Sequence, residues 1–157
     1  MQVMVSLEVK GAFDVAWWPS FLKQLIELKC RKNLYNLSAR FVSNRKVTLL
    51  INNYKTEKEV QKGCPQGFCC GPCFWNVMHN SLLNLKFNSR NKVIAFADDL
   101  IVLTRGACKI ETENYANQDL KRIERWATDN KIEFNDKNRR FYLYQGKETT
   151  TRKLIFI

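Results

Sequence analysis

The spacing of hydrophobic side chains changes several times along the chain, and each change predicts a new secondary-structure element. Short apolar stretches bounded by turn residues predict strands, at residues 3–9, 46–51, 55–61, 92–96 and 100–103. Apolar side chains that recur every three or four residues predict helices, at residues 18–26, 34–42, 73–85 and 109–130. The chain from Lys131 onward is weakly strand-like and rich in Arg, Lys and Thr.

Some of these elements carry further detail. Pro19 suits the first turn of its helix, and Asn52-Asn53-Tyr54 predicts a β-hairpin in which Asn adopts a positive φ. Helical spacing relates Trp18, Phe21, Leu22, Leu25 and Ile26 in the first helix, and it places Leu34, Leu37 and Phe41 on one face of the second. The core stripe expected in the longest helix is Ala116, Leu120, Ile123, Trp126 and Ala127. The order β-α-α-β-β-α-β-β-α-β predicts an α+β fold, with helices on one face of an antiparallel-rich sheet. This layout is compatible with a ferredoxin-like core.

Composition and charge narrow the functional classes. The chain has 157 residues, 45% hydrophobic and 26% charged, which is typical of one globular domain. Its 26 Lys and Arg against 15 Asp and Glu give a net charge of +11. This excess indicates a polyanionic partner, nucleic acid before an anionic membrane, although charge also serves solubility. We expect weak, sequence-independent and salt-sensitive binding to RNA or an RNA–DNA duplex.

Membrane and secretory classes are not expected. Residues 93–103 are the best apolar stretch, but Asp98 and Asp99 interrupt it, and the N-terminal residues do not resemble a secretory signal. We therefore expect an intracellular protein, in the nucleus or cytoplasm, with reduced cysteines, no membrane contact and no specific protein partner.

Four of the six cysteines cluster, which raises the question of a metal site. Cys64, Cys69, Cys70 and Cys73 lie within ten residues of each other, and His79 is the single histidine. Zinc sites usually use Cys pairs that are well separated in sequence, or Cys with His. We therefore favour buried small thiols and keep a zinc-binding module as an alternative.

Two adjacent carboxylates, Asp98 and Asp99, lie between apolar strands. Burying two like charges is costly unless a cation neutralises them, and Mg²⁺ binds such carboxylates together with phosphate oxygens. An exposed Asp-Asp hairpin tip explains the same residues equally well. The wider sequence decides between these two interpretations.

Three ordered motifs resemble those of reverse transcriptases, and most closely the non-LTR (LINE- and Jockey-like) retrotransposon class. They read SLEVKGAFD at residues 6–14, KGCPQGFCCGP at residues 62–72 with Trp75-Asn76 following, and FADD at residues 96–99. In that class the patterns are L-D-V-K-G-A-F-D, G-C-P-Q-G-S-x-x-G-P-x-x-W-N and [FY]-A-D-D. The helix with Trp126 and the following residues 130–135 also look like this family, so the resemblance runs from about residue 7 to residue 137.

The resemblance implies a fold, a reaction and partners. It implies a reverse transcriptase palm over residues 1–137, with fingers and thumb largely missing, and a divergent tail over residues 138–157. It implies RNA-directed DNA synthesis from dNTPs on an RNA template and a DNA primer, with two Mg²⁺ ions. The implied roles are metal ligation by Glu8, Asp98, Asp99 and the Val9 carbonyl, sugar selection by Phe13, pocket shaping by Gln66 and Gly67, and protonation of the leaving pyrophosphate by Lys137. Core packing is the alternative role for Phe13.

Departures from the family pattern predict impaired catalysis. Glu8 stands where the family has Asp, and Phe68 stands where it usually has Ser. One extra methylene displaces a carboxylate that must be placed within about 0.5 Å. The tail also departs from the family, and we hypothesise a one-base deletion in the source gene that puts it out of frame. The alternative to an impaired polymerase is a non-catalytic basic remnant that binds nucleic acid through charge.

Overall fold

The computed structural model describes residues 1–64, 67, 69–135, 140–145 and 148–151. The chain divides into two compact units: Met1–Lys10 together with Asn80–Ile157, and Gly11–His79. Each unit is described by itself.

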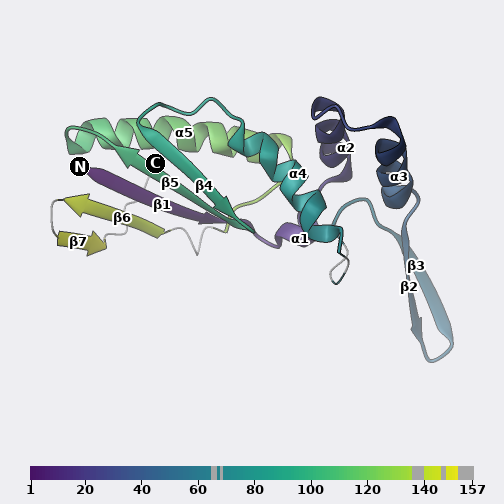
Figure 1. Cartoon of the computed structure of the whole chain (residues 1–157). Coiled ribbons are helices and arrows are strands. Elements are labelled where there is room, and N and C mark those ends of the chain that lie inside the picture. Colours follow the sequence, from purple (N-terminus) through teal and green to yellow (C-terminus); the bar gives the residue numbers. More distant parts are fainter. Residues whose placement is uncertain (65–66, 68, 136–139, 146–147, 152–157) are drawn as a thin grey trace. The chain divides into compact units, whose positions relative to one another are not determined.

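The first unit is built on a five-stranded antiparallel sheet, ordered β4-β5-β1-β6-β7. The strands are β1 (Gln2–Glu8), β4 (Asn91–Phe96), β5 (Asp99–Arg105), β6 (Arg140–Gln145) and β7 (Glu148–Thr151). The helix α5 (Lys109–Asp129) lies along one face of this sheet (Figure 1). The predicted α+β layout, with a helix on one face of an antiparallel sheet, is confirmed for this unit.

The core of the first unit follows from the alternation of side chains along each strand. In β1 the buried residues Val3, Val5 and Leu7 alternate with more exposed ones, and in β5 Leu100 and Val102 are fully buried. Side chains that alternate along a strand point to opposite faces, so these five residues face α5. The opposite face, away from α5, is called the open face below.

The second unit contains short helices and a separate hairpin. Its elements are α1 (Ala12–Val15), α2 (Trp18–Glu27), α3 (Lys32–Val42), β2 (Lys46–Ile51), β3 (Tyr54–Glu59) and most of α4 (Gly71–Leu83). The ring of Phe74 on α4 stacks on Phe21 of α2, with centroids 4.1 Å apart, and meets Phe41 of α3 edge-on at 5.7 Å. These aromatic contacts join the three helices.

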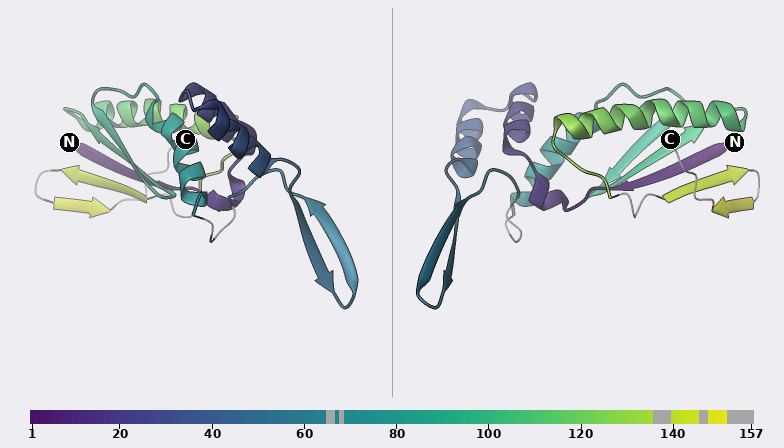
Figure 2. Two further views of the ribbon diagram at one scale, coloured as in Figure 1. Left: turned by 45° about the vertical axis from the view of Figure 1, so that its right-hand side comes forward. Right: turned by 180° about the vertical axis from the view of Figure 1, so that it is seen from behind.

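The β2–β3 hairpin forms a two-stranded sheet of its own, which is visible in both views of Figure 2. Asn52 and Asn53 connect the strands with φ of 46° and 67°, as expected for asparagine in a tight hairpin. Every residue of both strands is exposed.

The structure gives burial and element detail that helical spacing alone does not. Ile26, Leu34 and Leu37, which lie on the apolar faces predicted for the first two helices, are 62%, 50% and 66% exposed. Helical spacing identifies a common face, but only packing decides whether anything covers that face. Asp119, a charged residue on the core side of α5, is instead completely buried. The tail contributes two strands to the sheet, and the short helix α1 was not foreseen.

Within the described residues, none of the helices combines the length and apolar character needed to cross a membrane.

Candidate active site

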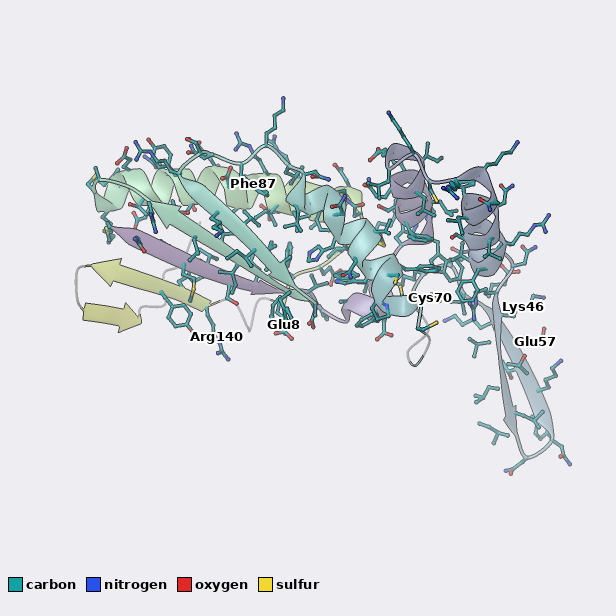
Figure 3. The ribbon with its side chains drawn as sticks, viewed as in Figure 1. Glu8, Lys46, Glu57, Cys70, Phe87 and Arg140 are labelled. Carbon is teal, nitrogen blue, oxygen red and sulfur yellow. The ribbon has the colours of Figure 1, made fainter. Side chains whose placement is uncertain are left out.

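Two acidic segments that are distant in sequence meet at one end of the five-stranded sheet. Glu8 is the last residue of β1, and it lies directly opposite Asp99, the first residue of β5. Residues directly opposite each other on neighbouring strands share a face of the sheet, and the burial pattern places this pair on the open face. Figure 3 shows Glu8 extending away from α5 where the strands converge. The first strand therefore ends beside the Asp98–Asp99 hairpin, as metal ligation by both segments requires.

Backbone hydrogen bonds hold the end of β1 from both sides. The Val9 N–H donates to the Asp98 carbonyl, with N and O 3.0 Å apart. On the other side, the Asn135 N–H donates to the Glu8 carbonyl at 2.8 Å, and the Lys10 N–H donates to the Glu133 carbonyl at 2.9 Å. The acidic end of β1 is therefore fixed between the β4–β5 turn and the segment that follows α5.

The β4–β5 turn has an unusual backbone. Phe96 pairs with Asp99, so Ala97 and Asp98 form the turn, and Ala97 has φ of 53°. A non-glycine residue in this region costs on the order of 1–3 kcal/mol and is tolerated where the surrounding structure enforces it. Asp98 is half-buried and Asp99 is exposed. The register therefore places Asp99, rather than Asp98, opposite Glu8.

The donor set at this end of the sheet consists of oxygen atoms. Three carboxylates and the Val9 carbonyl are hard ligands of the kind that Mg²⁺ prefers. The residues are therefore chemically suited to the ion that the family resemblance implies. Across the described ranges, no group of three or more His, Cys, Asp or Glu side chains is placed so that it could hold a metal ion. What the geometry does show is one pair of facing carboxylates, with a third carboxylate in the adjacent turn.

The first and second motifs meet in the second unit. The Cys64 N–H donates to the Phe13 carbonyl at 2.5 Å, and the Gly63 N–H donates to the Ala16 carbonyl at 2.7 Å. The indole of Trp18 donates to the Gly63 carbonyl at 2.8 Å. Gly63 has φ of 100°, and a Cβ there would lie 3.3 Å from the Asp14 carbonyl oxygen, so this close approach requires glycine.

The residues expected to bind the nucleotide are only partly described. Phe13 lies on α1, is half-buried, and has its ring centroid 6.4 Å from that of Trp75. Gly67 is exposed with φ of 83°, and a Cβ there would meet no atom within 4 Å. Gln66, Phe68 and Lys137 lie outside the described residues.

The clustered cysteines differ in burial. Cys64 is buried, and this desolvation together with the nearby Cys70 raises its pKa to about 11. Cys69 and Cys73 are exposed, so the interpretation of the cluster as buried thiols is right for Cys64 and wrong for these two.

Thiol alkylation at pH 8 tests this difference. Because the thiolate is the reactive form, the raised pKa leaves Cys64 protonated until the pH approaches about 11. We expect iodoacetamide to modify Cys69, Cys73 and Cys108 in the native protein, and Cys64 only after unfolding. Peptide mass spectrometry measures each site, and native modification of Cys64 at the rate of Cys69 would contradict the prediction.

Two features of the site were not found by sequence reasoning. One is the role of residues 133–135 in holding β1, and the other is the positive φ of Ala97. The resemblance of residues 130–135 to the family was the available signal for the first. Nothing in the sequence predicted the positive φ of Ala97, because alanine rarely adopts a positive φ.

Comparisons with known proteins identify the family of the chain. The family described as "Reverse transcriptase (RNA-dependent DNA polymerase)" matches residues 1–155. The chain is 31% identical over 123 residues to a 115 kDa protein in type-1 retrotransposable element R1DM of Drosophila melanogaster, covering 78% of this chain and 12% of that protein. It is 25% identical over 136 residues to the RNA-directed DNA polymerase from mobile element jockey of Drosophila funebris, covering 82% of this chain and 15% of that protein.

Solved structures show the same fold. The apo telomerase of Candida tropicalis, truncated from its C-terminal domain, superposes with a TM-score of 0.75 at 12% identity, covering 99% of this chain and 33% of that chain. The telomerase of Candida albicans in complex with a telomeric RNA fragment superposes with a TM-score of 0.65 at 12% identity, covering 94% of this chain and 27% of that chain. The likeness supports the α+β palm-like fold. The chain spans about an eighth of the R1DM protein that it matches.

Proposed function

Because the chain belongs to the reverse transcriptase (RNA-dependent DNA polymerase) family, we propose that residues 1–137 are the palm of a non-LTR retrotransposon polymerase. The proposed reaction is nucleotidyl transfer from a dNTP to a DNA primer, directed by an RNA template. One observation carries this proposal: Glu8 and Asp99, which are far apart in sequence, face each other at one end of the sheet. Acidic side chains from two separate strands are what shared metal ligation requires.

The acidic residues at this end of the sheet have a proposed role in metal binding. The carboxylates of Glu8, Asp98 and Asp99 and the carbonyl of Val9 would hold two Mg²⁺ ions. When bound, such ions stabilise the attacking and leaving oxygens of phosphoryl transfer. No backbone N–H among the described residues donates to the Val9 carbonyl, whereas the Val9 N–H is engaged by Asp98. The turn thus positions the Asp98 carboxyl through its own backbone.

The nucleotide would be selected in the second unit. The Phe13 ring, half-buried on α1, would occupy the space of a ribose 2′-OH and so favour dNTPs. Its backbone is fixed by the Cys64 N–H. Gln66 and Gly67 would shape the same pocket, and Lys137 would protonate the pyrophosphate that leaves.

The proposed activity is impaired by Glu8. The extra methylene moves this carboxylate relative to an Asp, and a misplacement of about 1 Å can cost on the order of a hundredfold in rate. This residue also favours a second candidate function, a non-catalytic basic domain that binds nucleic acid through its net charge of +11.

Metal titration tests the site without relying on turnover. We expect Mg²⁺ or paramagnetic Mn²⁺ to perturb the backbone NMR signals of Glu8, Asp98 and Asp99, because Glu8 faces Asp99 and Asp98 lies in the adjacent turn. Asp98→Asn with Asp99→Asn should remove the perturbation. The matched control is Glu124→Gln with Asp129→Asn, which changes two exposed carboxylates of α5. Perturbation that survives the first pair of substitutions would contradict the proposed site.

A further inference from the structure

The open face of the five-stranded sheet is divided by charge. Its acidic residues, Glu8 and Asp99, lie at one end of β1 and β5. At the other end, Arg105 lies opposite Gln2, and Lys92 lies opposite Leu103. Arg140 extends from the same face at β6, opposite Ser6, as Figure 3 shows. The end at Glu8 and Asp99 therefore suits cations, with Arg140 beside it, and the end at Gln2 suits anions.

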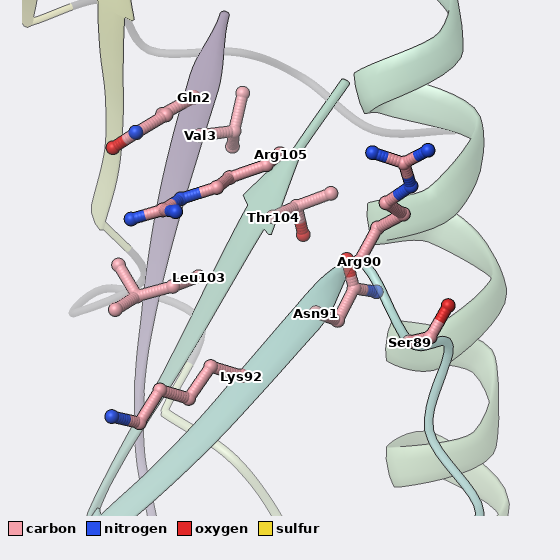
Figure 4. Close-up of a pocket in the computed structure, with 9 residues that line it drawn as sticks. All are labelled: Gln2, Val3, Ser89, Arg90, Asn91, Lys92, Leu103, Thr104 and Arg105. Carbon is pink, nitrogen blue, oxygen red and sulfur yellow. The ribbon is translucent and has the colours of Figure 1, made fainter.

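A pocket of about 400 Å³ lies at the basic end of the sheet. The side chains of Gln2, Lys92, Leu103 and Arg105 extend together on one side of the strands there (Figure 4). Arg90 also lines the pocket, but its side chain extends toward α5 (Figure 4), where it lies near Glu111. The open-face side of the pocket therefore carries two cations, Lys92 and Arg105, with the amide of Gln2 beside them.

Lys92 and Arg105 have no ion-pair partner within the described part of the chain. Both residues are exposed. Other exposed basic residues form ion pairs, such as Lys109 with Glu113 on α5 at 3.7 Å. Exposed Lys and Arg beside an amide donor are typical of contacts to backbone phosphates, which carry no sequence information.

The distance between the acidic and basic ends of the open face can be compared with the length of a nucleic-acid duplex. Six residues of antiparallel strand separate Glu8 from Gln2, which corresponds to about 20 Å at roughly 3.4 Å per residue. A duplex that runs along β1 with its reacting end at Glu8 and Asp99 would therefore present backbone phosphates to the basic pocket about 20 Å from that end.

We propose that Lys92 and Arg105 bind backbone phosphates of the nucleic-acid duplex about 20 Å from its reacting end. They act as positioning residues, because they hold the duplex and do not touch the reacting atoms. The proposal rests on the proposed function, since that function places the reacting end at Glu8 and Asp99.

Binding of a 12-base-pair RNA–DNA duplex, followed by fluorescence anisotropy at several salt concentrations, tests the contact. We expect Lys92→Gln with Arg105→Gln to weaken binding and to reduce the slope of log affinity against log salt by about two, one unit for each phosphate released. The matched control is Lys121→Gln with Arg125→Gln, which removes the same charge from exposed positions of α5. Equal losses in the two variants, or no duplex binding by the unaltered chain, would overturn the proposal.

A second arm locates the contact. Uncharged methylphosphonate linkages are introduced one at a time along each strand, and we expect the unaltered chain to lose affinity at linkages that lie about 20 Å from the reacting end. The Lys92→Gln, Arg105→Gln variant should not show this loss. Dependence on the two residues without any preferred linkage would overturn the proposed placement. Preferential binding of the unaltered chain to phosphatidylserine vesicles through Lys92 and Arg105, rather than to the duplex, would also overturn the proposal.

The two proposals can fail separately. The anisotropy measurement needs no catalysis and no metal ion, whereas the Mg²⁺ titration needs no nucleic acid. A duplex contact without metal perturbation of Asp98 and Asp99 counts against the catalytic site alone. The reverse result counts against the basic pocket alone.

Discussion

Glu8→Asp with Phe68→Ser is expected to restore Mg²⁺-dependent DNA synthesis in a chimera in which residues 1–137 replace the aligned segment of the jockey polymerase. The 157-residue chain alone should show little or no primer extension, because it spans only a small part of the polymerases that it matches. Returning the carboxylate to the length of Asp places it where the family places it, and Ser frees the space of a large ring. We expect the two reversions to raise the rate of the chimera by on the order of a hundredfold.

Primer extension on an RNA template measures this effect. Asp98→Ala in the reverted chimera should abolish synthesis, whereas Asp129→Ala, at an exposed position of α5, should leave it unchanged. Circular dichroism and the unmodified jockey polymerase serve as folding and activity controls. Full activity of the chimera before reversion would show that Glu8 and Phe68 are tolerated.

Asp119→Ala is expected to destabilise the first unit by about 3–5 kcal/mol, the cost of breaking a buried, hydrogen-bonded charge network. The Asp119 side chain is fully buried on α5, where its carboxylate accepts the Asn88 N–H at 2.9 Å and the Asn91 side-chain amide at 2.5 Å. Arg122 forms an ion pair with its other oxygen. Removing the carboxylate leaves these donors without their partner and frees the connection that leads into β4.

Chemical unfolding followed by circular dichroism measures the loss. Asp119→Asn should cost less, because its amide oxygen can still accept the Asn88 N–H. Glu113→Ala, which removes a more exposed ion pair of the same helix, should cost under about 1 kcal/mol. If Asp119→Ala lowers the free energy of unfolding by no more than Glu113→Ala does, the hydrogen-bond network around Asp119 contributes little to stability.

Some sequence assignments remain predictions. Gln66, Phe68 and Lys137 lie outside the described residues, and no contact bears on their roles. The division of the chain at residue 137 and the reading-frame hypothesis for the tail are likewise proposals. Residues 140–144 nevertheless pair with β1, and the family match continues to residue 155.

The sequence by itself determined the elements and the family. The period of the apolar side chains located the strands and the main helices, because that period reflects local backbone geometry. Asn52 and Asn53 specified their turn for the same reason: asparagine tolerates a positive φ. The ordered acidic and Pro-Gln-Gly motifs identified the family, and with it the expectation that residues 8 and 98–99 meet.

Only the tertiary structure decided which faces are covered and which residues stand opposite each other. Leu34 and Leu37 share a helical face that stays exposed. Asp119 is buried where its carboxylate accepts hydrogen bonds from Asn88 and Asn91 and forms an ion pair with Arg122. The register of β1 against β5 places Asp99 opposite Glu8, and a shift of one residue would reverse the face of every side chain. Burial and register depend on contacts between segments distant in sequence, and local spacing carries no information about those contacts.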